Sequence, residues 1–304
     1  MTKPSLQPPG VIRDCVERLL PGSAQWRRVQ GGYTQAERWL VDYDGERRAF
    51  IKAAVDPPTT DWLRQEGRLY QAVQESWTAK KLAFHDDDGC VVLVIEDLSH
   101  ADWTPSWSRE RVRAVLDTLR AIHRTPVPEW VPLLVDEDLG VSEAGFRDRW
   151  QQVSDSPQGF MELGLCSASW FATHIESLVA AASRAVLAGG DLLHLDVRSD
   201  NMCFVPKTDG TERVVLVDWN WVAQGNGQVD VAFWLPTLAM EGGPLPHEIL
   251  PDEPELAALV SGFFAWEGSQ PREGDMIRIR DLQRAQLAVA FPWAIRALGL
   301  PPPL

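Results

Sequence analysis

The segment GDLLHLDVRSDNMCFVP alternates polar or charged side chains with apolar ones. His194, Asp196 and Arg198 are interleaved with leucines and valines, and Asn201 follows directly after Asp200. A strand buried on both faces would not carry these charges. A surface helix would collect its apolar residues on one side instead of alternating them. The pattern therefore predicts a loop whose polar groups are held between apolar anchors.

A β-hairpin is predicted directly after this loop. Met202–Val205 is expected to form a short strand, Asp209–Gly210 the tip of the turn, and Arg213–Val217 the second strand. In an antiparallel hairpin the start of the first strand lies beside the end of the second. Asn201 precedes the first strand and Asp218 follows the second. An amide oxygen and a carboxylate are therefore expected at the same rim of the hairpin.

These two side chains and Asp196, five residues before Asn201, indicate phosphoryl-transfer chemistry. Mg²⁺ prefers a few hard protein oxygens, and water and substrate phosphates complete its shell. The additional carboxylate is placed to accept the proton of an attacking hydroxyl. A single Asp–Asn pair in a loop is more typical of a turn or a cap. The complete set, with a hairpin-linked aspartate, favours catalysis.

The rest of the chain predicts an α+β protein with two lobes. The N-terminal lobe, residues 1–97 with a flexible tail over 1–10, is expected to contain one helix and several strands: Trp26–Val29, Ala36–Tyr43, Arg47–Ala54, Thr60–Gln74 (the helix), Leu82–His85 and Val91–Ile95. The C-terminal lobe, residues 98–304, is expected to be mainly helical: Ser108 to before Pro126, Ala168–Ala188 stopped by Gly189–Gly190, Glu253–Trp266 and Arg278–Leu298.

Charge and composition exclude several classes of function. The net charge of −14 would repel a polyanion, so nucleic acid is not expected as the main partner, whereas a cationic small molecule would be attracted. No apolar stretch approaches the roughly 20 residues that a membrane span needs, and the first ten residues do not resemble a secretory signal. Four scattered cysteines without a CxxC pair predict a reduced cytoplasmic protein without a zinc site.

The loop and the hairpin together resemble a known family. HLDVRSDN has the H-x-D-x-x-x-x-N spacing of a kinase catalytic loop, and LVDWN stands where kinases have DFG. The sequence resembles the aminoglycoside phosphotransferase and choline kinase branch of the protein-kinase-like fold, from about Val29 to Trp234. The resemblance implies a two-lobe fold with a small antiparallel-sheet N-lobe and a larger, mainly helical C-lobe. It also implies use of ATP, with GTP not excluded, and of Mg²⁺.

The resemblance implies a role for each residue of the loop and hairpin. Asp196 would be the catalytic aspartate that receives the proton of the acceptor hydroxyl. Asn201 and Asp218 would hold Mg²⁺. His194 would brace the loop through hydrogen bonds. Arg198 would stabilise the transferring phosphoryl group.

A phosphate-binding lysine is expected from the N-terminal lobe. Lys52 lies in the apolar strand RAFIKAAV, and Glu66 lies in the helix that follows. By the resemblance, an ion pair between them would aim the ammonium at the α- and β-phosphates. The alternative is a lysine that extends to solvent from an edge strand and a glutamate that is solvated on its helix.

Two backbone segments are expected to contact the nucleotide. Gly31 and Gly32, between the first two strands, permit close approach of main-chain N–H groups to phosphate oxygens. The strand VLVIEDL leads into the interlobe hinge of the family, where adenine would meet main-chain groups of Glu96, Asp97 and Leu98.

Three further residues are assigned structural roles. His123, at the end of its helix, is expected to pack or cap. Asp230 is expected to cap a helix that begins at Val231. Trp219 is expected to pack beneath Asp218.

The acceptor is expected to bind in the C-terminal lobe, which is rich in acids. Family members that modify aminoglycosides hold ammonium groups with such acids, although most acids form solvated faces. The candidates are Asp136, Glu137, Asp138, Glu143, Glu162, Glu241, Glu248, Asp252, Glu253, Glu255 and Glu267. Aromatic residues of this lobe could add a stacking wall or belong to the core: Trp234, Phe263, Phe264, Trp266 and Trp293.

The sequence therefore predicts a Mg·ATP-dependent phosphotransferase that acts on a hydroxyl of an amine-bearing antibiotic, sugar or amino alcohol. Antibiotic resistance is one role that such an activity serves. The alternative is a catalytically silent kinase-like protein that binds nucleotide or ligand. A weaker third interpretation is a metal-dependent phosphohydrolase, for which a second cluster of metal ligands is lacking.

Overall fold

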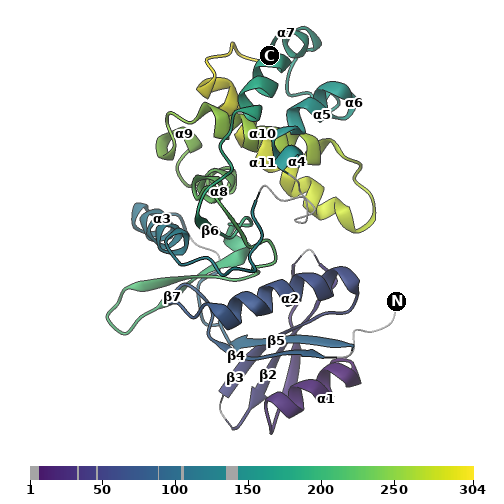
Figure 1. Ribbon diagram of the computed structural model, residues 1–304, viewed down its shortest axis with the longest axis vertical. Helices are drawn as coiled ribbons and strands as arrows, with labels where there is room; N and C mark the ends of the chain where they lie inside the picture. The colour runs from purple at the N-terminus through teal and green to yellow at the C-terminus, as the bar shows by residue number, and fades with distance from the viewer. Residues whose placement is uncertain (1–6, 33, 46, 88, 104–105, 135–142) are drawn as a thin grey trace. The chain divides into compact units, whose positions relative to one another are not determined.

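The computed structural model describes residues 7–304, apart from 33, 46, 88, 104–105 and 135–142. Its contacts divide the chain into two compact units (Figure 1). The first unit comprises residues 1–105 and 200–222, and the second comprises 106–199 and 223–304. The predicted hairpin thus belongs to the first unit, although a hundred residues separate it from the rest of that unit. The predicted lobe boundary at residues 97 and 98 stays a prediction.

A five-stranded antiparallel sheet forms the frame of the first unit. Its strands follow the order β1-β2-β3-β5-β4, with bounds Ala24–Arg28, Glu37–Tyr43, Arg47–Ala53, Cys90–Glu96 and Lys81–Asp87. The turn between β2 and β3 has positive φ angles at Asp44 and Gly45, 47° and 84°. Two consecutive left-handed residues match the right-handed twist of a hairpin. All five predicted strands are present.

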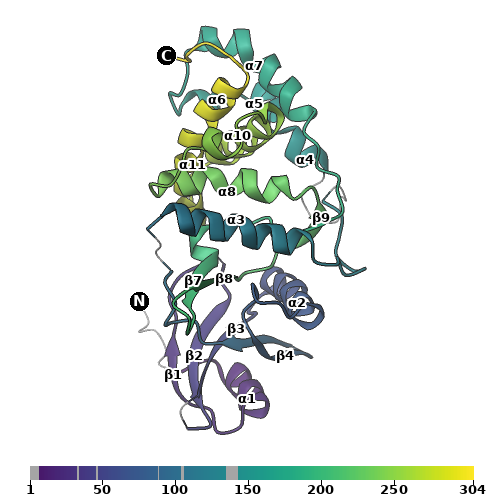
Figure 2. The same cartoon turned by 90° about the vertical axis from the view of Figure 1, so that its left-hand side faces the viewer.

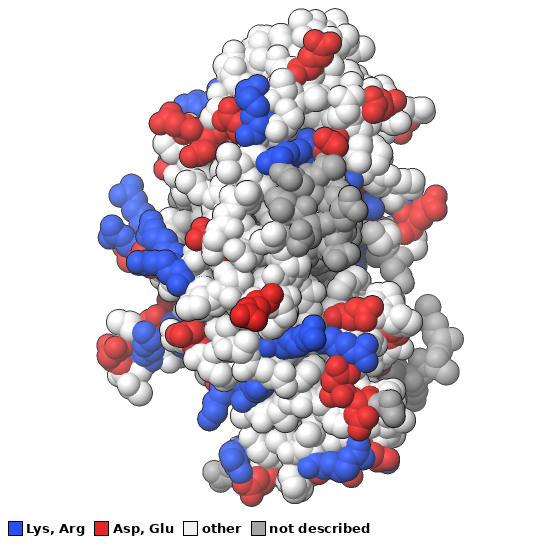
Figure 3. Space-filling model, viewed as in Figure 1, with Lys and Arg blue, Asp and Glu red and all other residues white. Residues whose placement is uncertain are grey.

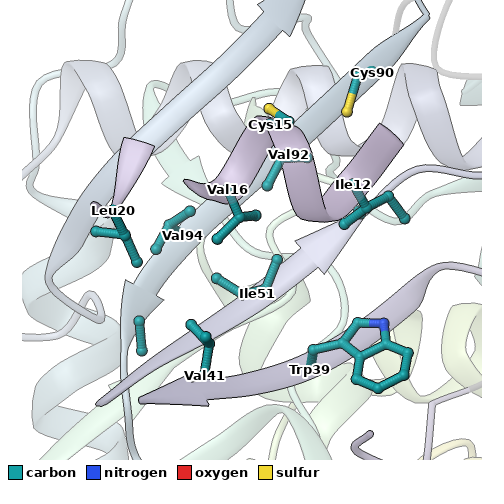
Figure 4. Close-up of a cluster of buried hydrophobic side chains, with 12 residues drawn as sticks. Ile12, Cys15, Val16, Leu20, Trp39, Val41, Ile51, Cys90, Val92 and Val94 are labelled. Carbon is teal, nitrogen blue, oxygen red and sulfur yellow. The ribbon is translucent and has the colours of Figure 1, made fainter. Parts of the chain in front are cut away.

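One face of this sheet is covered by a helix that the sequence analysis did not identify. Helix α1 spans Gly10–Leu19, and its side chains Ile12, Cys15 and Val16 are buried. They pack on alternate residues of the central strands, among them Ile51, in the cluster that Figure 4 shows. Ribbon diagrams place α1 and α2 on opposite sides of the sheet (Figure 1).

Helix α2, Pro57–Ala72, covers the other face. Asp56 caps its start, because its carboxylate accepts the N–H of Thr59 at 2.9 Å. Gly67 allows close packing, since a Cβ there would lie 2.0 Å from the ring of Phe84. Successive residues of a strand point to opposite faces. Ile51 faces α1, and Lys52 therefore faces α2.

The predicted hairpin consists of β7, Met202–Pro206, and β8, Glu212–Leu216. Met202 pairs with Leu216 and Val205 with Arg213. Gly210 has a φ of 82°, so the turn lies where the sequence predicts it. Met202, Phe204 and Leu216 are fully buried, which fixes the hairpin within the first unit.

The second unit is mainly helical. Its helices are α3 Arg109–His123, α4 Glu143–Arg147, α5 Arg149–Asp155, α6 Gln158–Met161, α7 Ala168–Ser183, α8 Gln228–Met240, α9 Pro246–Ile249, α10 Pro254–Ser269 and α11 Ile277–Ala297. Strands β6 Asp191–Leu193 and β9 Ala223–Gly225 form a short antiparallel pair. Helix α3 runs beside α8 (Figure 2).

The end of α7 differs from its prediction. The helix stops at Ser183, several residues before the glycine pair that was expected to end it. Residues 184–190 instead form an irregular segment whose main chain is paired elsewhere. The Ala185 carbonyl accepts from Arg147 Nε at 2.9 Å, and the Leu187 carbonyl accepts from the Asn226 N–H at 2.8 Å. These tertiary bonds replace the last helical turn.

Across the part of the chain that the structure describes, no helix is both long enough and apolar enough to cross a lipid bilayer.

Candidate active site in two parts

A buried ammonium between two carboxylates is the electrostatic centre of the first unit. Lys52 Nζ donates to Glu66 Oε2 at 2.7 Å and also to Asp218 Oδ1. Strand β3 supplies the lysine, α2 the glutamate, and the segment after β8 the aspartate. The lysine and glutamate side chains are 10% and 3% exposed, while that of Asp218 is 24% exposed. Asp218 is therefore the member of the trio that a solute can reach.

The charge of Lys52 is secured by its neighbours. Burial disfavours the ammonium, but the carboxylates of Asp218 and Glu66 together outweigh this cost, and the pKa of Lys52 lies above its ordinary value. The group thus stays cationic across the physiological pH range.

Asn220 belongs to the same network, and the sequence analysis gave it no role. Its Nδ2 donates to Asp218 Oδ1 at 2.6 Å, and its Oδ1 lies 3.3 Å from Lys52 Nζ. The side chain is buried. An amide can donate to the carboxylate and accept from the ammonium at once, which a purely acidic or basic residue cannot do. Asn220 is the last residue of the motif LVDWN, two residues after Asp218, so its position in that motif was the available signal.

The main chain of Asp218 is held in an unusual conformation. Its φ is 66°, in the left-handed region that non-glycine residues rarely adopt. Its N–H donates to Glu66 Oε1 at 3.2 Å. Trp219 beside it is fully buried, packs against Trp77 with tilted rings whose centroids are 5.1 Å apart, and donates from Nε1 to the Leu216 carbonyl at 3.1 Å. Trp219 thus occupies the packing position that was expected for it.

Asn201 lies at the other side of the hairpin rim. Its carbonyl accepts the N–H of Val217 at 2.9 Å, so the pairing of β7 and β8 continues to the residue before Asp218. The hairpin therefore brings the main chains of Asn201 and Asp218 to one end, as the sequence predicts. An amide oxygen and a carboxylate are the donor types that suit Mg²⁺, so this pair fits the ion by its chemistry. Among the described residues, no group of three or more His, Cys, Asp or Glu side chains could hold a metal.

The glycine loop is organised by an arginine. Gly31 and Gly32 have φ angles of 129° and 79°. A Cβ at Gly32 would lie 2.6 Å from the guanidinium of Arg38, which is itself bonded to the Thr34 carbonyl at 3.2 Å and the Ala36 carbonyl at 2.9 Å. Arg38 is a second residue without a role in the sequence analysis. The backbone conformation thus favours glycine at both positions, and a side chain at residue 32 would also displace the guanidinium of Arg38.

The end of β5 carries the residues expected at the nucleotide base. Glu96 accepts from the Lys80 N–H at 2.8 Å and from Arg213 at 3.1 Å. Asp97 accepts the N–H of Ser99 at 2.8 Å, and the Leu98 carbonyl accepts from Trp103 Nε1 at 2.9 Å. These side chains fix the local backbone, and a base-reading role for the segment stays a prediction.

Asp230 holds the loop of the second unit that contains His194, Asp196 and Arg198. Its carboxylate accepts the main-chain N–H groups of His194 at 2.9 Å and Leu195 at 2.7 Å, and His123 Nε2 lies 3.1 Å away. Asp230 has no exposed surface. The prediction that it caps a helix beginning at Val231 is wrong, because α8 already begins at Gln228. Its side chain binds the loop instead.

The loop itself is strained at Leu195, whose φ is 60°. His194 is fully buried, and its Nδ1 accepts the N–H of Asp196 at 3.2 Å. Asp196 faces Arg198, with Nη2 3.2 Å from Oδ2 and Nε 3.1 Å from Oδ1. The three predicted loop residues therefore lie together, and the guanidinium balances the charge of the carboxylate.

The end of the loop is tied to α8. Ser199 Oγ donates to the carboxylate of Glu241, which also accepts from Trp107 Nε1 at 2.9 Å. Trp107 packs edge-on against Trp234 with centroids 5.5 Å apart. Glu241, one of the acids proposed for the acceptor, thus has a local partner in the loop.

Other acids and aromatics of this lobe also have structural contacts. Glu267 pairs with Arg280 and, at 3.4 Å, with Arg149, and Glu255 lies 3.5 Å from Arg184. Residues 136–138 of the acidic set lie outside the described residues. Of the aromatics, Trp234, Phe264 and Trp293 are buried in the core.

A family comparison accounts for this arrangement. The sequence model of the phosphotransferase enzyme family matches residues 25–270. The chain belongs to that family. The match includes both parts of the site described above, from the glycine loop to Asp230. No curated protein matches the sequence closely enough to count as a relative.

Solved structures share the fold of this phosphotransferase at low sequence identity. An aminoglycoside phosphotransferase from Alicyclobacillus acidocaldarius is 17% identical to this chain. The alignment covers 96% of each chain, with a TM-score of 0.58. A thermostable mutant of aminoglycoside phosphotransferase APH(4)-Ia, in a ternary complex with ADP and hygromycin B, is 14% identical over 93% of this chain and 97% of its own, with a TM-score of 0.55. Choline kinase LicA from Streptococcus pneumoniae is 14% identical over 95% and 98%, with a TM-score of 0.51. The α+β, protein-kinase-like fold is thereby confirmed.

Proposed function

We propose that this phosphotransferase moves the γ-phosphate of Mg·ATP to a hydroxyl of a small, amine-bearing acceptor. The oxygen of the acceptor forms a bond to the γ-phosphorus, and the bond between that phosphorus and the bridging oxygen breaks. ADP leaves with the electron pair, and the acceptor proton passes to the carboxylate of Asp196. ATP is the proposed donor, since the solved APH(4)-Ia complex contains ADP; GTP is the alternative donor.

The single observation that carries the proposal is the buried Lys52 ammonium between Glu66 and Asp218. A lysine buried against two acids, one of them partly exposed, is costly to maintain for stability alone, since a buried ion pair rarely repays its desolvation. Lys52 would bind the α- and β-phosphates, while Glu66 would keep it aimed and Asn220 would orient Asp218.

Mg²⁺, held by Asn201 and Asp218, would neutralise phosphate charge during transfer. The main-chain N–H groups of Gly31 and Gly32, in the loop between β1 and β2, would donate to the phosphate oxygens. Glu96, Asp97 and Leu98 would present main-chain groups to the base.

Asp196 is the proposed proton acceptor of the second unit. His194 would hold the main chain of Asp196 in place. Arg198 would leave its pair with Asp196 and bind the transferred phosphoryl group instead. The existing Arg198–Asp196 pair supports this exchange, because a guanidinium forms bidentate bonds with phosphate as readily as with carboxylate.

The acceptor class follows from charge and from the relatives. The net charge of −14 attracts cations, and the solved APH(4)-Ia complex contains hygromycin B, an aminoglycoside. We therefore propose an acceptor with at least one amine, and antibiotic inactivation as one use of the activity. The proposed location is the cytoplasm, where ATP is available and four buried free thiols stay reduced.

The alternative of a catalytically silent binding protein has less support. A silent relative is expected to have lost the lysine, the catalytic aspartate or the metal aspartate. Lys52, Asp196 and Asp218 are all present.

The test is a screen of aminoglycosides, macrolides, amino alcohols and sugars for acceptor-stimulated ADP release, followed by two variants. Asp196→Ala should abolish transfer while ATP still binds, and Asp218→Ala should remove Mg²⁺-dependent nucleotide binding. Near-normal turnover in Asp196→Ala would refute the role of that residue. Nucleotide binding by the wild type with no acceptor-dependent turnover would support the silent alternative.

A further inference from the structure

A groove on the second unit has a composition that phosphotransfer does not explain. It lies between α3 and α9 and has a volume of about 790 Å³. Arg109, Arg113 and Arg120 contribute from one helix, and a set of apolar residues lines it as well: Val112, Leu116, Pro244 and Ile249. Two acids, Asp117 and Glu248, complete the lining. Apart from Glu248, which is among the acids considered for the acceptor, none of these residues has a proposed role in phosphotransfer.

The arginines are concentrated against the trend of the whole chain. The protein has a net charge of −14, yet α3 carries four arginines and only two acids, Glu110 and Asp117. In the space-filling view the lysine and arginine side chains gather over α3 at the left edge (Figure 3). The groove is therefore a local positive region on an acidic protein.

The position of these charges is unfavourable for the helix itself. Arg109 and Arg111 lie in the first turn of α3, where the helix dipole disfavours cations. Neither Arg109 nor Arg113 forms an ion pair with a described residue, and both are exposed. Arg120 pairs with Asp117, but both side chains are 60% exposed, so a competing anion can replace that contact. Helix stability does not account for this pattern.

The segment that leads into α9 adds exposed apolar surface. Met240 is 38% exposed and Leu245 is 50% exposed. The carboxylate of Glu248 accepts the Leu245 N–H at 2.7 Å, so it is held against its own helix start. Arginine beside exposed apolar side chains is the composition of protein-docking surfaces.

We propose that the α3–α9 groove binds an acidic segment of another protein that carries apolar side chains between its carboxylates. Arg109 and Arg120 are eleven residues apart, or about 16 Å along the helix axis. An extended segment of about five residues spans that length. Its carboxylates would bind the arginines, and its apolar side chains would contact Val112, Leu116 and Ile249. A nucleic acid would match the arginines but not the apolar floor.

Fluorescence anisotropy with the whole protein and a labelled peptide of alternating glutamate and leucine tests this proposal. Wild type is compared with R109E/R113E and with the matched control R184E/R296E, which changes the net charge equally at exposed sites of the same unit. We expect wild type and control to bind alike and R109E/R113E to bind at least about tenfold more weakly. A lysine–leucine peptide should prefer R109E/R113E to wild type and to the control, and a far-UV circular dichroism spectrum equal to that of wild type shows that the variant is folded.

Three results would overturn the proposal. Equal binding by all three proteins would mean general attraction of a polyanion. Equal binding of a peptide with serine in place of leucine would remove the role of the apolar floor. A single-stranded oligonucleotide of the same charge that binds as tightly as the peptide would identify a nucleic-acid site instead. No nucleotide or acceptor is present, so the outcome is independent of the proposed phosphotransfer.

Discussion

Each of the two units places a buried carboxylate at the centre of its part of the site, but the partners differ in kind. The principal partner of Glu66 is a side chain, the ammonium of Lys52, although Glu66 also accepts the N–H of Asp218. The principal partners of Asp230 are two main-chain N–H groups, although His123 Nε2 also lies beside it. Asp218 in the first unit and Leu195 in the second are both non-glycine residues in the left-handed region, with φ angles of 66° and 60°. Side-chain partners can exchange for a ligand, while main-chain partners fix a loop. The first unit thus has the adjustable electrostatics, and the second has the rigid scaffold.

The largest expected effect is that of Asp230→Ala. It leaves the N–H groups of His194 and Leu195 buried without an acceptor, at a cost of about 1–3 kcal/mol for each group. We expect a loss of about 4 kcal/mol in the free energy of unfolding, measured by urea denaturation, and loss of turnover. Asp117→Ala, an exposed acid on α3, is the control and should change stability by less than about 0.5 kcal/mol. A small effect of Asp230→Ala would mean that the loop keeps its form without this acceptor.

The second prediction concerns the buried ion pair of Lys52 and Glu66. Lys52→Met leaves Glu66 as an uncompensated buried charge and should cost about 3 kcal/mol. The double variant K52M/E66L should regain most of that stability, because it replaces the pair with apolar groups, yet it should remain inactive. No such rescue is expected for Asp230, whose partners are main-chain groups. If the double variant is no more stable than the single one, the pair does not behave as a buried ion pair.

The same pair predicts a pH dependence at the alkaline end. Because the pKa of Lys52 is raised in the folded state, its contribution is complete below the ordinary value near 10.4 and is lost as the pH rises through the raised value. The free energy of unfolding of the wild type should therefore fall more steeply above pH 10 than that of K52M/E66L. Parallel curves for the two proteins would show that Lys52 titrates normally.

The two regions also differ in what the sequence reveals. The pairing of Lys52 with Glu66 could be predicted because the family resemblance implies it and the periodic pattern of each segment places the two residues on a strand and on the helix after it. The function of Asp230 could not, since its partners are main-chain N–H groups that every residue but proline possesses. Its assignment as a cap was wrong for that reason. Asn220 was overlooked although it stands next to a recognised motif, because an amide with two charged partners is identified only by its distances.

The predicted helix boundaries were wrong where tertiary contacts determine the end of a helix. Helix α7 stops at Ser183 because the following carbonyls bind Arg147 and Asn226, partners that local sequence does not reveal. Helix α1 was missed although Ile12, Cys15, Val16 and Leu19 show helical spacing. Its neighbouring prolines favoured a tail instead. The strands and the hairpin were predictable because their alternation and their glycine turns are local signals.

A smaller effect is expected at Asn220, in the adjustable part of the site. Asn220→Ala removes one donor to Asp218 and one acceptor for Lys52, both charged partners, and should cost about 2 kcal/mol. We expect a higher KM for ATP with a smaller change in kcat, because the residue orients groups that hold the nucleotide. Asn220→Asp is the stricter comparison, since it keeps the shape and adds a like charge beside Asp218. An Asn220→Ala enzyme with an unchanged KM would exclude the orienting role.

The smallest effect tests the rigid part of the site at Leu195. Its φ of 60° costs an L-residue about 1–2 kcal/mol, a cost that glycine does not have. Leu195→Gly and Leu195→Ala remove nearly the same side chain, so their difference isolates the backbone. We expect the glycine variant to be about 1 kcal/mol more stable than the alanine variant by urea denaturation, the reverse of their usual order. If the bonds to Asp230 are what impose this conformation, the difference should vanish in an Asp230→Ala background, where the loop is free to relax. A difference that persists there would assign the strain to the neighbouring packing of the loop instead.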